Sequence, residues 1–309
     1  MRVNLTRQRR TSFGWGGTMN FSSPFSHAII PPIMLEDIQK ALTKYWGYDS
    51  FLPLQKEAMG CVLGKRDSIV VLPTGGGKSL CFQLPAVSMP GLAVVVSPLI
   101  SLMKDQVDSL NECGIAAERI DSSLSPDEQR IIIAKIYNKT LKLLYLAPER
   151  LVSDGFIKIL QKVDLSFIAI DEAHCVSMWG HDFRPEYRQL GMLKQVFPDV
   201  TIGAYTATAT ELVRSDIAEQ LGLKDPQMLI GSFDRPNLVY KVQPRKNIVK
   251  QVCEIIDRHK DESGIVYCIR RRDVDEICGE LRGRGYNAAP YHAGMDDEDR
   301  RKNQDLFIN

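Results

Sequence analysis

Three consecutive glycines followed by a lysine and a serine form the most chemically informative stretch of this 309-residue chain. Because glycine has no Cβ atom, the loop Thr74-Gly75-Gly76-Gly77 lets backbone N–H groups close around a phosphate chain. Lys78 adds a point charge for the outer phosphates, and the Ser79 hydroxyl can ligate Mg²⁺. These residue types in this order predict a site for the phosphates of a nucleotide.

The elements that flank this loop agree with that prediction. Residues 68–72 (SIVVL) are apolar and mostly β-branched, which predicts a buried parallel strand that ends at the loop. The residues after Ser79 predict a helix, whose N-terminal N–H groups and dipole favour an anion. The general phosphate-loop pattern has a glycine five residues before Gly77, where this chain has Leu72. The alternative is a plain glycine-rich turn, which the strand–GGGKS–helix context disfavours.

A second group of candidate catalytic residues follows the apolar run 167–170 (FIAI). Asp171 and Glu172 are adjacent, and successive side chains at a strand end diverge, so the two carboxylates can do different work. Asp171 can hold the Mg²⁺ that bridges the outer phosphates, and Glu172 can orient and deprotonate the attacking water. His174 completes the stretch DEAH. The alternative is an acidic strand-to-helix turn without chemistry.

Two residues upstream of the glycine loop, Gln55 and Tyr48, are candidates for binding a nucleotide base. A glutamine amide can both donate to and accept from an adenine edge. A tyrosine ring can stack on the base. A surface glutamine and a core tyrosine without ligand contacts are the alternative.

The stretch after the carboxylates, 175–187 (CVSMWGHDFRPEY), combines aromatic and charged side chains. Trp179 and Phe183 have faces that stack on unpaired bases of any sequence, and Arg184 can pair with a phosphate. His181 lies between them. Such a loop could report nucleic-acid binding to the preceding carboxylates. The alternative is a hydrophobic corner that packs Trp179 and Phe183 into the core.

The composition, 44% apolar and 25% charged residues, is that of an ordinary soluble globular protein. A formal net charge of +1 gives no strong global field, so any nucleic-acid surface must be local. No apolar run approaches a membrane span, so we expect no membrane partner. The cysteines form no C-x-x-C pair, which argues against structural zinc and for reduced thiols in a prokaryotic cytoplasm or a eukaryotic nucleus. They are Cys61, Cys81, Cys113, Cys175, Cys253, Cys268 and Cys278.

The chain is predicted to divide into residues 1–33, 34–232 and 233–309. Residues 1–33 are rich in Arg, Ser and Thr, with no acidic residue before Glu36, and predict a disordered extension. An organelle transit peptide is the second interpretation of that segment. Apolar residues at helical spacing predict the first helix over 34–46.

Within 34–232, short strands alternate with helices, which predicts an α/β fold with a parallel sheet covered on both faces. Ligands of such sheets lie at the carboxyl ends of the strands, where all the motifs above fall. Ser125 and Glu128 predict a capping box that opens a helix to Asn138. The stretch 206–210 (TATAT) either links the nucleotide site to a lobe interface or caps the next helix. The predicted strands are 68–72, 92–98, 143–147, 167–171, 202–206 and 228–231, and further helices are predicted over 99–111 and 211–221.

Residues 233–237 (FDRPN) interrupt this alternation and predict an interdomain connection. A second alternation follows, with helices over 247–260, 271–282 and 296–307 and strands over 264–269 and 287–292. About seventy residues are too few for a complete doubly wound domain. The second domain is therefore expected to be incomplete.

Taken together, these residues resemble superfamily 2 helicases, and specifically the RecQ family of DNA helicases, from about Met34 to the last residue. The most family-specific piece is 179–187 (WGHDFRPEY), which is similar to the RecQ aromatic-rich loop that couples single-stranded DNA to ATP hydrolysis. In that context stacking is favoured over the hydrophobic corner. The other matching segments are Gln55 (adenine-reading motif), 74–79 (motif I), 97–106 (motif Ia), 171–174 (motif II), 206–208 (motif III), 264–270 (motif IV), 233–238 and 291–294.

The resemblance implies two RecA-like (P-loop NTPase) lobes with ATP and Mg²⁺ between them, and 3′-to-5′ translocation with duplex unwinding. It implies single-stranded DNA and 3′-tailed duplexes as partners. It assigns Lys78, Asp171, Glu172 and His174 to catalysis.

Three departures from the RecQ pattern matter. Leu52 replaces an arginine that the family usually has near the adenine, so we expect looser base selectivity. The chain ends before motifs V and VI, whose arginines are expected to stabilise phosphoryl transfer, and an arginine finger is worth about 10³ to 10⁵ in rate. No zinc subdomain or winged helix follows. A fragment or natural truncation of a helicase is therefore expected, and the alternatives are a non-catalytic ATP- and nucleic-acid-binding module and an RNA helicase.

Overall fold

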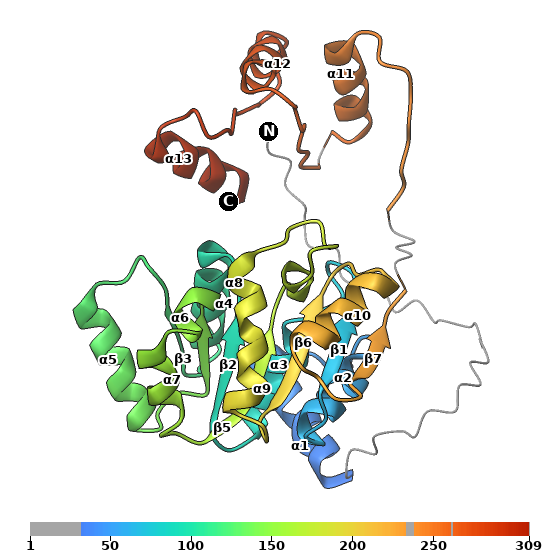
Figure 1. The fold of residues 1–309 in the computed structure, drawn as a ribbon. Coiled ribbons are helices and arrows are strands. Elements are labelled where there is room, and N and C mark those ends of the chain that lie inside the picture. The colour runs from blue at the N-terminus through green and yellow to red at the C-terminus, as the bar shows by residue number, and fades with distance from the viewer. Residues whose placement is uncertain (1–31, 233–237, 261, 309) are drawn as a thin grey trace, which may run out of the picture. The chain divides into compact units, whose positions relative to one another are not determined.

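The computed structural model describes residues 32–232, 238–260 and 262–308 (Figure 1). Their described parts form two compact units, 32–232 and 238–308. The predicted N-terminal extension and the predicted connection at 233–237 lie outside the described residues, except for Pro32 and Ile33, which open the first helix.

The larger unit is built on a seven-stranded sheet in which every recorded strand pair is parallel, in the order β3-β4-β2-β5-β6-β1-β7. This confirms the predicted α/β fold with a parallel sheet. Strand β6 lies between β5 and β1, so the strands that carry the DEAH and glycine-loop segments flank β6. The strands are β1 Ser68–Val71, β2 Leu92–Val96, β3 Ala117–Ile120, β4 Leu143–Leu146, β5 Leu165–Ile170, β6 Thr201–Thr206 and β7 Gln227–Ile230.

Helices cover both faces of this sheet, as Figure 1 shows. Ile69 and Val71 of β1 belong to one buried cluster, and Val70 belongs to the other. This double burial explains the uninterrupted apolar sequences of the central strands. The helices are α1 Pro32–Ala41, α2 Gln55–Leu63, α3 Leu80–Ser88, α4 Ile100–Glu112, α5 Pro126–Tyr137, α6 Pro148–Leu151, α7 Asp154–Leu160, α8 Pro185–Arg188, α9 Leu193–Val196 and α10 Glu211–Gln220, with a π-helical turn at Leu42–Trp46 and 3₁₀ turns at Ala173–Val176 and Gln189–Met192.

Local capping signals set two helix starts, one predicted outright and one that was among the two alternatives for the stretch 206–210. The Ser125 hydroxyl accepts from the Glu128 backbone N–H, and the Glu128 carboxylate accepts from the Ser125 backbone N–H, which is the predicted capping box at α5. The Thr210 hydroxyl accepts from the Val213 N–H at 3.3 Å and caps α10. Each such cap stabilises a helix by about 1 kcal/mol.

The edge strand β3 was not predicted from the sequence. Its ends, Ala117 and Ile120, are buried, whereas Glu118 and Arg119 between them are partly exposed. Among the described strands it pairs with β4 alone. Two charged residues in a four-residue strand hide the apolar signal, and an edge position tolerates them.

The smaller unit contains α11 Ile248–Arg258, α12 Arg271–Gly283 and α13 Asp297–Ile308, which confirms its three predicted helices. The predicted strands at 264–269 and 287–292 are wrong, because neither segment joins a strand ladder among the described residues. Ile265, Tyr267 and Ile269 are all exposed, at alternate positions. The two-residue period that predicted a strand is therefore present, but a strand also needs a hydrogen-bonded neighbour.

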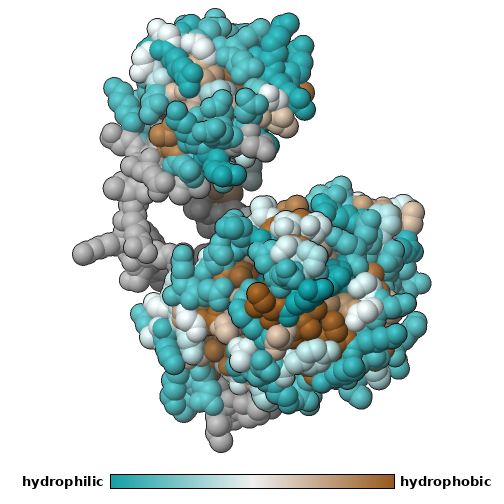
Figure 2. Space-filling model, turned by 90° about the vertical axis from the view of Figure 1, so that its left-hand side faces the viewer, coloured by the Kyte–Doolittle hydropathy of each residue, from teal (hydrophilic) through white to brown (hydrophobic). Residues whose placement is uncertain are grey.

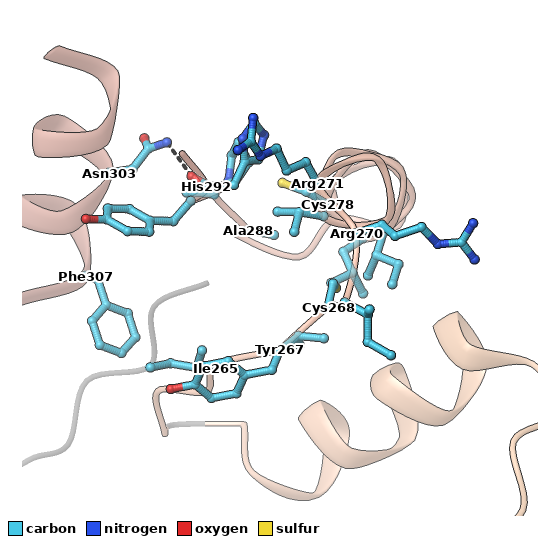
Figure 3. Close-up of a pocket in the computed structure, with 18 of the residues that line it drawn as sticks. Ile265, Tyr267, Cys268, Arg270, Arg271, Cys278, Ala288, His292, Asn303 and Phe307 are labelled. Carbon is cyan, nitrogen blue, oxygen red and sulfur yellow. Dashed lines mark hydrogen bonds between the residues drawn. The ribbon is translucent and has the colours of Figure 1, made fainter. Parts of the chain in front are cut away.

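A cavity of about 580 Å³ lies within the smaller unit (Figure 3). It is lined mainly by α12, α13 and the two extended segments, and the Asn303 amide closes one side by donating to the Pro290 carbonyl at 2.8 Å. Its walls are largely apolar, and none of the predicted catalytic residues lines it.

The surface seen in Figure 2 is mostly hydrophilic, with hydrophobic patches on the larger unit. Among the described residues, no helix combines the length and apolar character that crossing a lipid bilayer requires.

Candidate nucleotide and nucleic-acid site

The glycine loop joins the end of β1 to the start of α3, as predicted. Gly75 and Gly77 have φ values of 81° and 72°, in the left-handed region that favours glycine. A Cβ atom on Gly77 would come within 2.3 Å of the Gln55 amide nitrogen, and one on Gly76 within 2.8 Å of the Pro73 carbonyl. The loop can therefore take this path only with glycine at these positions.

The side chain of Gln55 supports the glycine loop through hydrogen bonds. Its side chain is 2% exposed, its carbonyl accepts from the Leu52 N–H at 2.8 Å, and its amide donates to the Gly77 carbonyl at 3.1 Å. One amide N–H is left for a further acceptor. The alternative of a surface glutamine is therefore wrong. The sequence predicted a contact of Gln55 with a base and did not reveal this contact with the loop.

Tyr48 has a ring that is 52% exposed and free to stack. The backbone around it is fixed by the Thr43 hydroxyl, which donates to the Tyr48 carbonyl at 3.1 Å, and by the Gln39 amide, which donates to the Asp49 carbonyl at 3.0 Å. The alternative of a core tyrosine is therefore wrong.

Lys78 and Ser79 stand where the loop meets α3. The Lys78 ammonium donates to the Leu72 carbonyl at 3.2 Å, so it folds back over the loop. The Ser79 hydroxyl makes no capping bond to α3. Both groups therefore lie at the helix N-terminus, where a phosphate is favoured.

Asp171 is almost completely buried at the end of β5. Burial, and then the neighbouring Glu172 charge, raise the pKa of its carboxyl to about 6, while the Lys78 charge acts in the opposite direction. One carboxylate oxygen accepts from the Glu172 N–H at 3.0 Å. A buried carboxylate with so little compensation is the kind of ligand that a divalent cation would stabilise.

Glu172 leaves the strand in a left-handed conformation, with φ of 46°. Such a backbone costs a non-glycine residue about 1–3 kcal/mol and is typical of functional sites. Its side chain is partly exposed, and one of its oxygens lies 3.3 Å from Nδ1 of His174. The two adjacent carboxylates thus occupy different environments, as predicted.

His174 connects three of the predicted motifs. Its Nδ1 lies 2.8 Å from the Thr206 hydroxyl at the end of β6, and its ring stacks on His181 with centroids 4.1 Å apart. Burial, and then the charge of His181, lower the pKa of His174 to about 4. The imidazole is therefore neutral near pH 7, where it can exchange hydrogen bonds without adding charge.

The aromatic loop presents Trp179 to solvent. Trp179 is 67% exposed, so the alternative of a buried tryptophan corner is wrong, whereas Phe183 is half-buried. The base of the loop is held by the Ser177 hydroxyl, which donates to Asp216 of α10 at 2.6 Å. Gly180 packs so tightly that a Cβ atom would lie 2.3 Å from the His174 carbonyl.

Arg184 joins this loop to the segment that precedes α4. Its guanidinium donates to the Pro98 carbonyl at 3.2 Å and to the Asp182 carboxylate at 2.9 Å. Tyr187, by contrast, is fully buried, and its hydroxyl donates to the Asp171 carbonyl at 3.0 Å. Tyr187 is therefore a core residue that supports Asp171, a role that sequence reasoning missed.

Among the described residues, one group has metal-ligating atoms that converge, within 4.8 Å of one another: His174, Cys175 and Asp182. Asp182 is engaged by Arg184, and burial chiefly raises the pKa of the Cys175 thiol to about 12. Of the three, Cys175 and Asp182 are hydrogen-bonded, with the thiol donating to the carboxylate at 3.8 Å. All seven cysteines are free thiols.

The comparison with known proteins agrees with this geometry. Residues 52–215 match the model of the DEAD/DEAH box helicase family. The chain is 47% identical to ATP-dependent DNA helicase RecQ of Pasteurella multocida over 262 residues, covering 85% of this chain and 42% of that protein. It is 42% identical to RecQ of Bacillus subtilis, covering 89% and 47%. It is 39% identical to ATP-dependent DNA helicase Q1 of Rattus norvegicus, covering 86% and 45%.

Solved structures show the same fold. A crystal structure of the DUF1998 helicase MrfA bound to DNA and AMPPNP matches with a TM-score of 0.65 and 20% identity, over 91% of this chain and 42% of that one.

The sheet, the phosphate loop and the DEAH strand end thus define a P-loop protein, and the chain belongs to the DEAD/DEAH box helicase family. Within that family its relatives place it among the RecQ helicases, which confirms the resemblance drawn from the sequence. The chain spans less than half the length of these relatives.

Proposed function

We propose that this chain is the ATP-dependent motor core of a DNA helicase that moves 3′ to 5′ on single-stranded DNA and unwinds 3′-tailed duplexes. The observation that carries this proposal is the position of His174, which contacts Glu172, Thr206 and His181. His174 therefore links Glu172, which is assigned to water activation, to His181 in the loop assigned to DNA binding. That contact supplies a physical route from DNA binding to hydrolysis.

In this proposal the glycine-loop backbone and Lys78 bind the ATP phosphates, and Gln55 with Tyr48 binds the adenine. Ser79 and Asp171 would hold Mg²⁺, and the poorly compensated Asp171 carboxylate fits that role. When bound, Mg²⁺ neutralises charge on the outer phosphates. Glu172 orients and deprotonates the water that attacks them.

DNA binding is assigned to the aromatic loop. The exposed face of Trp179 stacks on an unpaired base, an interaction worth about 1–3 kcal/mol, and Phe183 supports it. Arg184 contacts the phosphodiester, and His181 passes the movement of the loop to His174. Because stacking does not read base identity, we expect binding that tolerates any sequence.

A second candidate function is ATP and DNA binding without unwinding. It is supported by the two extended segments of the smaller unit that join no ladder among the described residues.

The test of the proposed function is steady-state ATP hydrolysis by the 309-residue chain with and without single-stranded DNA. If single-stranded DNA stimulates ATP hydrolysis, the result supports the proposed helicase motor. ATP and DNA binding without turnover supports the second candidate. Competition by RNA oligomers that matches competition by DNA would favour an RNA helicase instead.

A further inference from the structure

Three polar side chains meet inside an otherwise apolar layer between α3, α4 and β4. The hydroxyl of Tyr145, a fully buried residue of β4, accepts from the Gln83 amide at 2.9 Å and donates to the Gln106 carbonyl oxygen at 2.9 Å. The Gln83 amide also donates to that oxygen, at 3.4 Å. These residues form a closed set of hydrogen bonds, the Gln–Tyr–Gln triangle. Each side of the triangle joins a different pair of elements, since Gln83 lies on α3 and Gln106 on α4.

The triangle is surrounded by apolar side chains. Phe82 and Ala86 of α3 belong to the same buried cluster as Met103 and Val107 of α4. Apolar contacts hold two helices together without a preferred direction, whereas a hydrogen bond is lost when its donor and acceptor slide past each other. Burial raises the pKa of the Tyr145 hydroxyl above its ordinary value, so it stays a neutral donor. The triangle therefore fixes the position of α4 along α3, which the apolar contacts alone do not.

One end of this connection is the phosphate loop. Gln83 lies in the first turn of α3, and its backbone N–H donates to the Ser79 carbonyl at 2.9 Å. Ser79 is the last residue of the GGGKS stretch and is assigned to the cation of the nucleotide in the proposed function. A displacement of Gln83 along the axis of α3 would therefore displace Ser79, because the two residues belong to one rigid helical turn.

The other end is the aromatic loop. Its Arg184 guanidinium donates to the Pro98 carbonyl at 3.2 Å, and α4 begins shortly after Pro98, at Ile100. Gln106 lies on that same helix. A movement of Arg184 toward a phosphodiester would consequently act on Pro98 and, through α4, on Gln106.

We propose that the Gln–Tyr–Gln triangle positions the phosphate loop in response to DNA, as a connection between Arg184 and Ser79 that is separate from the His174 contacts. Gln106 and Tyr145 are its positioning residues. This inference rests on the proposed binding of ATP at the phosphate loop and of DNA at the aromatic loop. Coupling between two binding sites is reciprocal, so it can be measured from either ligand.

The test measures the dissociation constant of a fluorescent, non-hydrolysable ATP analogue for the full chain, without DNA and with saturating single-stranded DNA. The ratio of the two constants is the coupling factor, and it requires no turnover. In the unmodified chain we expect a coupling factor of about five or more. Gln106→Leu should lower this factor by about threefold or more, while the constant measured without DNA changes by less than about twofold. A variant that is merely unstable would weaken binding in both conditions and leave the ratio unchanged.

Tyr145→Phe is the second variant, which guards the test against misfolding of Gln106→Leu. It removes one hydroxyl and keeps the buried ring, and it should lower the coupling factor by about twofold, because the direct contact between Gln83 and Gln106 remains. The matched controls make the same substitutions at exposed positions, namely Gln195→Leu on α9 and Tyr137→Phe on α5. Both controls should keep the coupling factor of the unmodified chain.

The outcomes separate the inference from the proposed function. A coupling factor that is the same in the unmodified chain and in both variants would overturn the inference and leave the proposed function intact. Nucleotide binding by the unmodified chain that does not respond to DNA would count against both. A loss of coupling that is equally large in the two controls would overturn the inference, because those side chains lie outside the triangle.

Discussion

His174 Nδ1 and the Thr206 hydroxyl lie 2.8 Å apart, although 32 residues separate them in the chain. The hydroxyl continues the contact by donating to the Thr208 carbonyl at 3.2 Å. The end of β6 is thereby tied to the DEAH segment at the end of β5. A rearrangement of residues 206–208 would therefore move the His174 side chain, which also contacts Glu172.

Thr206→Val should uncouple hydrolysis from DNA. Valine keeps the shape of threonine but removes the hydroxyl, so Nδ1 of His174 loses its 2.8 Å partner and keeps only the Glu172 carboxylate oxygen at 3.3 Å. We expect DNA-stimulated ATP turnover to fall about tenfold, with ATP affinity nearly unchanged. Thr201→Val, at the other end of the same strand, is the control. Equal losses in both variants would mean that the effect is one of stability.

Lys78→Ala should remove ATP turnover while the fold is kept. In the structure the ammonium contacts only a carbonyl of its own loop among the recorded hydrogen bonds, so its loss costs little stability. We expect turnover to fall by about 10² or more, since a positioned charge on the phosphates is lost. Thermal unfolding and ATP hydrolysis are measured together. Retained turnover would refute the assignment of this loop to phosphate binding.

Gly77→Ala should destabilise the larger unit by about 1–3 kcal/mol. The new methyl group would be 2.3 Å from the Gln55 amide, on a backbone with φ of 72°. Gly155→Ala is the matched control, because Gly155 lies in the helix α7 with no atom within 4 Å of an added Cβ. It should be neutral or stabilising. The free energy of unfolding of both variants is measured with a denaturant. An equal change in the two variants would contradict the close contact predicted at Gly77.

Asp171 and His174 should give opposite dependences of stability on pH. The pKa of Asp171 is raised to about 6, so the folded state retains a proton that the unfolded state has lost, and its contribution falls as pH rises from about 4 to 6. The pKa of His174 is lowered to about 4, so its contribution rises with pH from about 4 to its unfolded value near 6.5.

The two contributions are separated by Asp171→Asn and His174→Gln. Relative to Asp171→Asn, the unmodified chain should lose unfolding free energy as pH rises through this window. Relative to His174→Gln, it should gain unfolding free energy. Urea unfolding between pH 4 and 7 measures both differences in the free energy of unfolding. Differences that stay constant with pH would contradict the shifted pKa values of Asp171 and His174.

The sequence predicted the parts of the structure that local pattern determines. The apolar strand 68–72, the glycine loop and the helix after Ser79 appear in that order because each is specified by adjacent residues. The Ser125 capping box is likewise a contact across three residues. The DEAH segment and the glycine loop meet at one edge because parallel strands end together.

The sequence did not predict contacts made across the fold. Tyr187 looked like part of an aromatic DNA loop, yet its hydroxyl supports the Asp171 carbonyl. The Gln106 side chain is hydrogen-bonded to Gln83 and Tyr145, which lie 23 and 39 residues away in the chain. No local periodicity of the sequence reveals such contacts. The strands expected at 264–269 and 287–292 failed for the same reason, because a strand requires a partner that its own residues do not specify.

The most direct test of the central claim compares ATP turnover with and without single-stranded DNA in the unmodified chain and in Trp179→Ala. Trp179 is exposed, so its loss should leave the fold and the DNA-free rate unchanged. The account predicts that DNA accelerates turnover in the unmodified chain and that this acceleration falls to near unity in Trp179→Ala. An acceleration of the same size in both proteins would contradict the coupling of the aromatic loop to the nucleotide site.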